Sequence, residues 1–567
     1  MRPGIACPAV RLHDSRGRND DMASERARRP RPGPRGAPLD AAAVVQVSEA
    51  IGDMPRRPDL LIEALHAVQG RFGCIRHAHL QALAHLFNLP PVAPFEAATF
   101  YAHFDVIADD APAPPAITVR VCDSLPCAMA GAAALHDALR AALPEARVIA
   151  APCMGACHRA PACAVGHALV ETADVEAVEH AIRGHVSIPA PPTCDAYRAR
   201  GGYAALASAP EPEALTALVE QAGLRGLGGA GFPAARKWRL TRAHPGPRHL
   251  VVNADEGEPG TFKDRWCLET EPHRVLEGML LAAHAVEAET CWIYLRDEYH
   301  HLLAPLRRAI DDVRAAGLCR GDIHLRRGAG AYICGEETAL LESIEGRRGY
   351  PRHKPPFPGE HGLFGRPTLI HNVETLWWLP EIVAHGPEMF ASQGRYGRKG
   401  RRLLSVSGRV RDPGVKDAPA GITARELIEE FCGGMAEGHR FAAYLPGGAS
   451  GGILPASMAD LPLDFGVLEP HGCFVGSGAV IVLSDRDDLA EAARNLVRFF
   501  RDESCGQCTP CRVGTAKAAA LLDAPAWDRA LLEELAAAMA DGSICGLGQA
   551  AMNPVLSILR HMPEVAR

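Results

Sequence analysis

Apolar residues recur at helical spacing through residues 41–110 of this 567-residue chain. Large apolar side chains lie three and four residues apart, the pattern of helices facing a core, and they include Leu60, Leu61, Leu65, Val68 and Phe72. This range therefore predicts a helical segment. Residues 1–40 have no such period and are rich in Arg, Pro and Gly, so we expect a disordered tail.

Residues 111–186 change to a pattern in which strands alternate with helices. Short apolar runs at 116–121 and 147–150 predict two strands, and the stretch 129–143 between them has helical spacing. This order predicts a small α/β domain. The following residues, 187–202, are rich in Pro and Gly and are predicted to form a linker.

The second half of the chain shows three further patterns. Residues 203–400 alternate helices with apolar strands, which predicts a parallel sheet, and the strands are expected at 249–253, 291–295 and 323–326. Short strands, Pro-Gly turns and one helix predict a compact α+β module over 401–485. Residues 486–567 have helical spacing and are predicted to form a helical domain.

Charge and hydropathy argue against two classes of function. The chain carries 60 basic and 67 acidic residues, a net charge of −7, whereas binding nucleic acid needs a basic surface. The most apolar stretch, 275–295, is interrupted by His284 and by glutamates, so no direct membrane insertion is expected. Because no secretory signal is recognisable, the expected location is cytoplasmic.

Cysteine is frequent, with 18 residues, and many of these fall into two groups. Grouped cysteines in a chain without a secretory signal indicate metal or cluster ligation rather than disulfides. The first group comprises Cys122, Cys127, Cys153 and Cys157, and the second comprises Cys505, Cys508, Cys511 and Cys545.

The second cysteine group has the sharper spacing. Three thiolates at two-residue intervals can hold three irons of a cubane, and Cys545 would supply the fourth ligand. Zinc is the alternative, although structural zinc sites usually use two cysteine pairs. The first group does consist of two pairs, each just after a predicted strand, so zinc is a closer alternative there.

A glycine-rich run, Gly226-Leu-Gly-Gly-Ala-Gly231, formally matches G-x-G-x-x-G, but a predicted helix rather than a strand precedes it. This context disfavours a standard dinucleotide-binding turn. Adjacent glycines still allow backbone N–H groups to approach a phosphate or a flat ring, and Lys237 can add positive charge. The alternative is a tight turn between two helices.

Polar residues follow directly on the predicted strand that ends near residue 253. Asn253, Asp255, Glu256 and Glu258 stand where open α/β sheets bind ligands. Their oxygens can accept hydrogen bonds from ribityl or ribose hydroxyls and from an amide-bearing ring. A solvated acidic loop is the alternative.

Two further segments carry candidate ligand contacts. Residues 328–338 follow a predicted strand, form another glycine-rich turn and open a helix. The segment 351–358 is too rich in proline for regular structure, and it can hold Lys354 and Phe357 rigidly over a cofactor.

Together these motifs resemble those of a known family. Residues 203–567 resemble the flavoprotein subunit of respiratory complex I and its soluble relatives, through the strings GLGGAGFP, NADEGEPGTFKDR, GAYICGEETALLESIEG and SCGQCTPCRVGT. Residues 45–186 resemble the small ferredoxin subunit beside it, through EAATFYAHF, CDSLPC and CMGAC. The resemblance implies an α/β multidomain fold with an N-terminal helical segment, a thioredoxin-like 2Fe–2S ferredoxin domain, a Rossmann-like FMN/NAD domain, a β-grasp-like module and a C-terminal helical 4Fe–4S bundle.

The resemblance also implies the site residues. An FMN pocket is expected to be lined by Gly226, Gly228, Gly229, Lys237, Asn253, Asp255, Glu256, Gly335, Glu336 and Asn372, with Gly231 completing the cofactor-binding loop. NADH is expected to meet Phe232, Glu258, Glu337, Lys354 and Phe357. Glu256, Glu258 and Glu337 are the expected catalytic residues. The first cysteine group is expected to hold the 2Fe–2S cluster and the second the 4Fe–4S cluster.

Two positions depart from the family pattern. Leu240 stands where many relatives carry a second stacking Phe, and His371 stands where complex I members usually have Asn. The implied cofactor set is otherwise self-consistent. NAD(H) exchanges two electrons as hydride and iron–sulfur clusters carry one at a time, so FMN is needed between them.

Fusion of two subunits in one chain is more typical of soluble NAD-dependent enzymes than of complex I. With the run GLRGLGG, it resembles the β (diaphorase) subunit of a cytoplasmic NAD-dependent formate dehydrogenase, whose partner would be a molybdenum- or tungsten-containing α subunit. The alternatives are the diaphorase subunit of a NAD-reducing hydrogenase and the NADH-binding subunit of complex I. A zinc-bearing scaffold without redox activity is an alternative from a different class.

Overall fold

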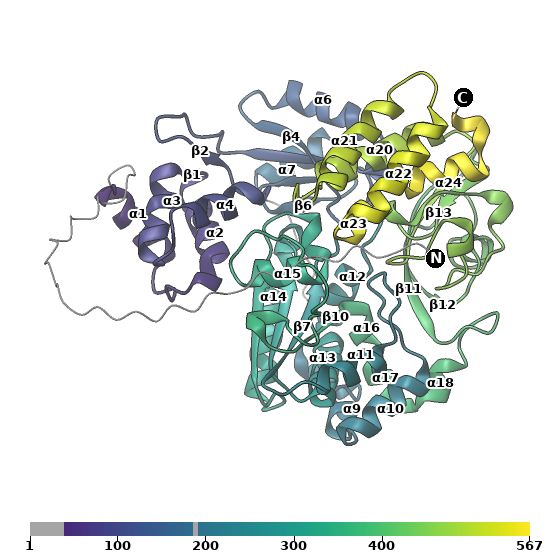
Figure 1. The fold of residues 1–567 in the computed structure, drawn as a ribbon, viewed down its shortest axis with the longest axis horizontal. Coiled ribbons are helices and arrows are strands. Elements are labelled where there is room, and N and C mark those ends of the chain that lie inside the picture. Colours follow the sequence, from purple (N-terminus) through teal and green to yellow (C-terminus); the bar gives the residue numbers. More distant parts are fainter. Residues whose placement is uncertain (1–38, 185–190, 567) are drawn as a thin grey trace, which may run out of the picture. The chain divides into compact units, whose positions relative to one another are not determined.

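The computed structural model describes residues 39–184 and 191–566. The predicted tail, 1–40, lies almost entirely outside the described residues. From Asp40 onward the chain forms one unit of contacting elements, shown in Figure 1.

The first part of this unit is helical, as predicted. Its elements are α1 (Ala41–Ile51), α2 (Leu61–Phe72), β1 (Ile75–Arg76), α3 (His77–Leu86), α4 (Val92–Phe100) and β2 (Val106–Ile107). Asp40 begins α1 by accepting a hydrogen bond from the N–H of Ala42 at 2.9 Å. Gly73, in the left-handed conformation, ends α2. We call residues 40–110 the helical segment.

The small α/β domain follows. Its strands are β3 (Thr118–Cys122), β4 (Arg147–Ala151), β5 (Cys163–Val165) and β6 (Ala168–Val170), and its helices are α5 (Leu125–Met129), α6 (Ala132–Ala142) and α7 (Val175–Ile182). The sheet order is β4-β3-β5-β6, with β3 parallel to β4 and antiparallel to β5. The helix predicted over 129–143 begins later, at Ala132, because Gly131 at φ +87° separates α6 from α5.

The range 187–202 is not simply a linker. It contains α8 (Cys194–Ala199), in which Cys194 and Tyr197 are buried. The Tyr197 hydroxyl donates to the carboxylate of the buried Glu277 at 2.6 Å. The helix was missed because the flanking prolines and glycines masked a six-residue amphipathic helix that packs on the next domain.

A four-stranded parallel sheet forms the centre of that next domain, residues 203–400, which we call the parallel-sheet domain. Its strands are β7 (Arg248–Ala254), β8 (Ala288–Leu295), β9 (Asp322–Arg327) and β10 (Thr368–Asn372), in the order β10-β7-β8-β9. The three predicted strands are confirmed, and β10 was not predicted. The chain runs outward from β7 through β8 to β9 and then returns to the other side of β7. The strand order therefore reverses between β7 and β10.

Helices cover this sheet. They are α9 (Ala204–Ala207), α10 (Pro212–Ala222), α11 (Ala234–Arg242), α12 (Lys263–Thr270), α13 (Pro272–Val286), α14 (Leu303–Ala315), α15 (Glu337–Ile344), α16 (Val373–Trp377), α17 (Leu379–His385) and α18 (Pro387–Ala391). Almost every residue of α13 is buried, because this helix contacts both β7 and β8 and is itself covered by other helices. The 3₁₀ turns η3 (Asp297–Leu302) and η4 (Tyr332–Gly335) connect strands to helices at the sheet's carboxyl edge.

A second, mixed sheet forms the α+β module. Its strands are β11 (Arg401–Gly408), β12 (Gly414–Pro419), β13 (Phe441–Leu445), β14 (Leu454–Pro455) and β15 (Ala479–Ser484), in the order β12-β11-β15-β13-β14. The predicted helix is α19 (Ala424–Glu426), which continues as a π-helical turn through Leu427–Phe431. A capping box between Thr423 and Glu426 begins it.

Helices complete the chain, as predicted. They are α20 (Leu489–Asp502), α21 (Thr509–Leu522), α22 (Arg529–Gly542), α23 (Gly546–Ala550) and α24 (Asn553–His561). One hydrophobic core runs from the helical segment through α15 to these helices, with Leu65, Leu340 and Leu496 among its buried members. The α/β multidomain fold expected from the sequence is confirmed.

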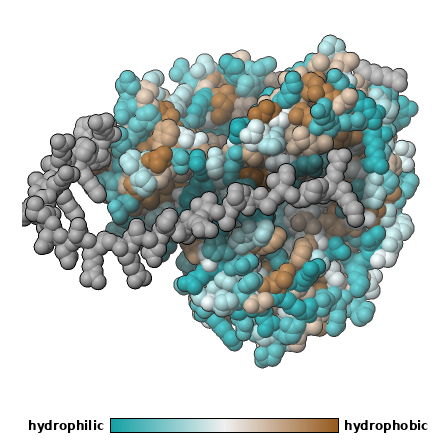
Figure 2. Space-filling model, viewed as in Figure 1, coloured by the Kyte–Doolittle hydropathy of each residue, from teal (hydrophilic) through white to brown (hydrophobic). Residues whose placement is uncertain are grey.

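The surface is mixed in character. The face drawn in Figure 2 is largely hydrophilic, with separate hydrophobic patches. Among residues 39–184 and 191–566, no helix combines the length and the apolar character needed to cross a membrane.

Candidate functional site

The carboxyl ends of β7 and β10 place two predicted residues side by side. Asn253 and Asn372 are paired in the parallel register of these strands. They lie where the strand order reverses, and open α/β sheets bind ligands in the crevice outside the strand ends at such a point. The Asn253 amide donates to the carbonyl of Gly335 at 2.9 Å, which ties the end of β7 to η4. The candidate site is therefore built at the switch point of the parallel sheet.

The glycine-rich loop, 226–231, approaches this switch point closely. A Cβ added to Gly228 would lie 3.0 Å from the Cβ of Asn372. Gly229 and Gly231 have φ of +122° and +63°, and a Cβ on Gly231 would lie 2.6 Å from the Phe465 ring. A side chain at Gly228 would therefore crowd the end of β10, and one at Gly231 would clash with the Phe465 ring, so glycine is needed at both positions. The loop is thus more than a turn between helices.

Glu256 holds the beginning of α12 through hydrogen bonds. Its carboxylate accepts the N–H groups of Asp264 and Arg265 at 2.8 and 3.0 Å and the Tyr299 hydroxyl at 2.8 Å. These bonds hold the first turn of α12 and leave the side chain 5 % exposed. Burial raises the pKa of Glu256 to about 8. These bonds give Glu256 a structural role at the start of α12, and its predicted contact with a cofactor stays a prediction.

Glu258 lies between three segments. Its carboxylate accepts the Tyr332 hydroxyl from η4, and it accepts the N–H and hydroxyl of Ser450 at 2.7 and 2.6 Å. Burial raises the pKa of Glu258. A Cβ on Gly448 would lie 2.7 Å from Glu258 Cγ, so the α+β module closes tightly on this residue.

Sequence reasoning missed Tyr332 and Ser450. Tyr332 lies inside the run GAYICGEETALLESIEG, but nothing in the sequence around it indicates that its hydroxyl would bind Glu258. Ser450 lies in the run Pro446-Gly-Gly-Ala-Ser-Gly-Gly452, and that density of glycine was the signal that could have found it.

Two lysines converge on Glu337 at the N-terminus of α15. Lys237 Nζ and Lys354 Nζ lie 3.0 and 3.1 Å from the Glu337 carboxylate, and Lys354 also lies 2.8 Å from Glu336. Burial alone would raise the pKa of Glu337, but the two ammonium groups lower it to about 2. Ammonium groups beside a helix N-terminus favour anions such as phosphate.

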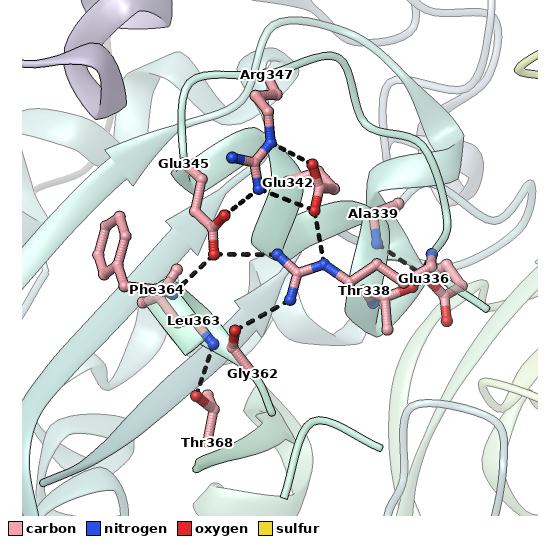
Figure 3. Close-up of polar contacts among 11 residues, drawn as sticks. Glu336, Thr338, Ala339, Glu342, Glu345, Arg347, Gly362, Leu363, Phe364 and Thr368 are labelled. Atoms are coloured by element: carbon pink, nitrogen blue, oxygen red, sulfur yellow. Dashed lines mark hydrogen bonds and ion pairs between the residues drawn. The ribbon is translucent and has the colours of Figure 1, made fainter. Parts of the chain in front are cut away.

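The proline-rich segment that carries Lys354 and Phe357 is held to α15. Arg352 donates to Glu342 at 2.6 Å and to Glu345 at 3.0 Å. Figure 3 shows these two carboxylates, which also face the guanidinium of Arg347. The ion pairs of Arg352 thus add to the rigidity that was predicted from the prolines of this segment.

Two predicted aromatic rings remain open to solvent. Phe357 is 58 % exposed and Phe232 is 39 % exposed, which is unusual for phenylalanine and leaves both rings free to stack on a planar ligand. Arg236 lies 5.5 Å from the Phe232 ring centroid. Leu240, where relatives carry another aromatic residue, is 51 % exposed.

His371 is a buried residue of β10, directly before Asn372. Its Nε2 accepts the indole N–H of Trp238 at 2.6 Å, and its side chain is buried. Burial, reinforced by Lys237, lowers the pKa of His371 to about 3, so the ring stays neutral and can accept this bond. His371, at the position where relatives usually have Asn, therefore joins α11 to β10 and adds no positive charge to the site.

The first cysteine group lies together in the small α/β domain. Cys122 ends β3, Cys127 lies in α5, and Cys153 and Cys157 follow β4, with the sulfur atoms of the last two 3.3 Å apart. All four are buried. Arg296 of the parallel-sheet domain donates to the carbonyl of Cys153 at 2.7 Å, so the two domains meet beside this group.

The second cysteine group lines one cavity. Its walls are Ile333, Pro351, Ser504, Cys505, Gln507, Cys508, Cys511, Ile544, Cys545 and Leu547. The four thiols thus face a common space, although Cys545 lies 34 residues after Cys511 in the sequence. Ile333 adjoins Tyr332, and Pro351 begins the proline-rich segment, so this cavity adjoins the site at the switch point.

The sulfur spacing bears on the zinc alternative. Among the described residues, neither cysteine group has three sulfur atoms that all lie within 4.8 Å of one another. Sulfurs about 2.3 Å from a tetrahedral zinc ion lie about 3.8 Å apart. A single ion bound by all four thiolates of either group would therefore require sulfur atoms to move closer together, although those of Cys153 and Cys157 already lie 3.3 Å apart.

Three family models match the chain in consecutive regions. The Nuo51 FMN-binding domain matches residues 219–381, and the iron–sulfur binding region of NADH-ubiquinone oxidoreductase-F matches residues 491–567. The thioredoxin-like [2Fe-2S] ferredoxin model matches residues 47–185. Each matched region contains the residues of one candidate centre.

Curated relatives and solved structures agree with these models. The second F-type subunit of NADH-quinone oxidoreductase in Rhizobium meliloti is 41% identical over 396 residues, which is 66% of this chain and 94% of the relative. The mitochondrial NADH dehydrogenase [ubiquinone] flavoprotein 1 of Dictyostelium discoideum is 43% identical over 60% of this chain and 76% of the relative. The structure of a NAD+-reducing [NiFe]-hydrogenase in the H2-reduced state is similar with a TM-score of 0.78 and 33% identity, and the match covers 90% of this chain and 92% of that one.

Proposed function

This chain belongs to the family of flavoprotein subunits that includes the F-type subunit of NADH-quinone oxidoreductase, and from that premise we propose that it is the β subunit of a cytoplasmic NAD-dependent formate dehydrogenase. Membership of this family establishes the general function of the chain. The chain is an oxidoreductase subunit with FMN-binding, 2Fe–2S and 4Fe–4S domains, and NADH is the substrate of its family. The finer assignment concerns the partner that exchanges electrons with it.

When bound, FMN exchanges hydride with NAD(H) and single electrons with the clusters. The chain's own residues bind and orient these groups. We assign the FMN contacts to the glycine-rich loop, Lys237, the ends of β7 and β10, and η4. Glu256 supports this pocket by fixing α12.

We assign NADH to the open side of the same site. Phe232 and Phe357 offer exposed faces for the adenine. Lys354 lies beside the N-terminus of α15, where its ammonium group, shared with Glu336 and Glu337, and the N–H groups of the helix would meet the nucleotide's phosphates. Glu258, oriented by Ser450, is the carboxylate placed to accept hydrogen bonds from the nicotinamide end.

Electrons leave through the thiolate-lined cavity in this proposal. The cavity and the flavin site share neighbouring residues, because Ile333 lines the cavity and Tyr332, next in the chain, donates to Glu258. Short separations between centres favour the transfer of single electrons along them. The 2Fe–2S domain contacts the parallel-sheet domain through Arg296, which follows the end of β8.

The partner is proposed from the fused arrangement of the chain. One polypeptide carries both the ferredoxin and the flavoprotein regions, and the run GLRGLGG resembles that of formate dehydrogenase β subunits. A second candidate is the diaphorase part of a NAD-reducing hydrogenase, which is favoured by the structural match over 90% of the chain. The third is the NADH-binding role in a quinone-reducing complex.

The isolated chain is expected to reduce ferricyanide or a quinone dye with NADH and to leave formate unoxidised. The motivation is a flavin and nucleotide site without any recognisable molybdopterin-binding motif in the sequence. Dye reduction is measured by visible absorbance under nitrogen. Formate oxidation by the pure single chain would contradict the proposal that a partner subunit oxidises formate and this chain exchanges electrons with NAD(H).

The complex purified from its source distinguishes the three partners. Formate-dependent reduction of NAD+ supports the first proposal, and hydrogen-dependent reduction supports the second. NADH-dependent reduction of a membrane quinone by a larger assembly supports the third. A colourless preparation containing zinc and no flavin would instead support a scaffold without redox activity.

A further inference from the structure

A group of imidazole and carboxylate side chains lies away from the flavin site and both cysteine groups. His66 comes from α2, His103 follows α4, and Asp297 is the first residue of η3. One ligand atom from each residue lies within 4.8 Å of the other two. In the described part of the chain, this is the one set of three such residues that meets this spacing.

The hydrogen bonding of His66 prepares it as a ligand. Its Nε2 lies 2.8 Å from the carbonyl oxygen of Gly328, and a carbonyl can only accept, so Nε2 carries the proton. Its Nδ1 is buried and has no hydrogen-bond partner. Metal-bound histidines usually donate their other ring N–H to a carbonyl or carboxylate, which fixes the tautomer in this way.

Asp297 is held in a similar manner. Arg327 binds its Oδ1 at 2.6 Å, and His103 Nδ1 lies 2.8 Å from its Oδ2. The arginine orients the carboxylate and leaves Oδ2 directed toward the two histidines. An ion bound here would take the place of the hydrogen between His103 and Asp297.

Two further imidazole rings pack beside the three candidate ligands. His167 of the small α/β domain stacks on His103 with a centroid distance of 5.3 Å and on His300 with a distance of 4.1 Å. The positive charge of Arg327 is paired with Asp297.

We propose that His66, His103 and Asp297 form a binding site for one divalent transition-metal ion of the zinc type. Two imidazole nitrogens and one carboxylate oxygen are a common ligand set for such ions, with water completing the coordination. The site joins the helical segment to the parallel-sheet domain, because its ligands are supplied by both. Its expected role is to fix the helical segment in place, separately from electron transfer.

The test uses the full-length holoenzyme with its full complement of iron, so that the cluster cysteines are occupied. The enzyme is equilibrated with zinc, passed through a desalting column and analysed for zinc and iron. We expect one zinc ion per chain in addition to the iron. In His66→Gln the amide nitrogen can keep the bond to Gly328 while the Nδ1 ligand is lost, and zinc should bind at least about tenfold more weakly.

His85→Gln is the matched control, because His85 is exposed on α3 and belongs to no part of the cluster. Zinc should raise the thermal unfolding temperature of the wild type and of His85→Gln but not of His66→Gln. Equal zinc affinity in the wild type and His66→Gln would overturn the proposal. Anomalous scattering at the zinc edge, from zinc-soaked wild-type crystals, tests it without a variant, and a peak elsewhere with none at these three residues would also overturn it.

Discussion

Cys545→Ser is expected to remove or strongly alter the electron paramagnetic resonance signal of the 4Fe–4S cluster while the 2Fe–2S signal remains. Cys545 faces the same cavity as Cys505, Cys508 and Cys511, and a serine hydroxyl is a much poorer iron ligand than a thiolate. The iron content should fall correspondingly. The measurement is low-temperature spectroscopy of the dithionite-reduced enzyme together with iron analysis.

Cys319→Ser is the control for that variant. Cys319 is a partly exposed free thiol outside both cysteine groups, so its replacement should leave both signals and the iron content unchanged. If Cys545→Ser also kept both signals and all of its iron, Cys545 would be an ordinary thiol and the ligand set of the second cluster would need revision.

Phe357→Ala is expected to raise the KM for NADH about tenfold or more. Stacking on the adenine is worth about 1.5 kcal/mol, and about 1.4 kcal/mol corresponds to a factor of ten. This contact is remote from the nicotinamide, so it should stabilise ground and transition states alike and leave kcat less affected. Steady-state kinetics with ferricyanide as acceptor gives both constants.

Phe95→Ala provides the comparison for Phe357→Ala. Phe95 is also an exposed phenylalanine, at 45 %, but it lies on α4 in the helical segment. Its replacement should leave the KM for NADH unchanged. An unchanged KM in a Phe357→Ala enzyme that still holds FMN would place the nucleotide elsewhere on the chain.

Much of the fold could be predicted where the pattern was long and regular. The strands β7, β8 and β9 are covered by helices and appear in the sequence as apolar runs, such as Leu250-Val-Val252. Strand β10 was missed because its five residues follow a segment rich in Pro and Gly and end in polar His371 and Asn372. Helix α8 was missed because prolines and glycines surround it.

The candidate site was predictable in its parts but not in its connections. Cysteine spacing and glycine runs pointed to segments that the structure brings together, because those chemical requirements leave a local pattern. Glu256 binds the first turn of α12 across a separation of 8 residues, and Ser450 binds Glu258 across a separation of 192 residues. Neither contact leaves a local pattern in the sequence. The cluster of His66, His103 and Asp297 likewise has no local signature, since three separate segments build it.

Anaerobic titration of the purified wild-type chain with NADH tests the central claim most directly. The claim is that one polypeptide accepts hydride from NADH at a flavin and passes single electrons to two clusters. NADH should bleach the flavin absorbance, and two distinct cluster signals should be detectable once the enzyme is reduced. If NADH changed neither the absorbance nor the signals of an enzyme that dithionite does reduce, the account would be contradicted.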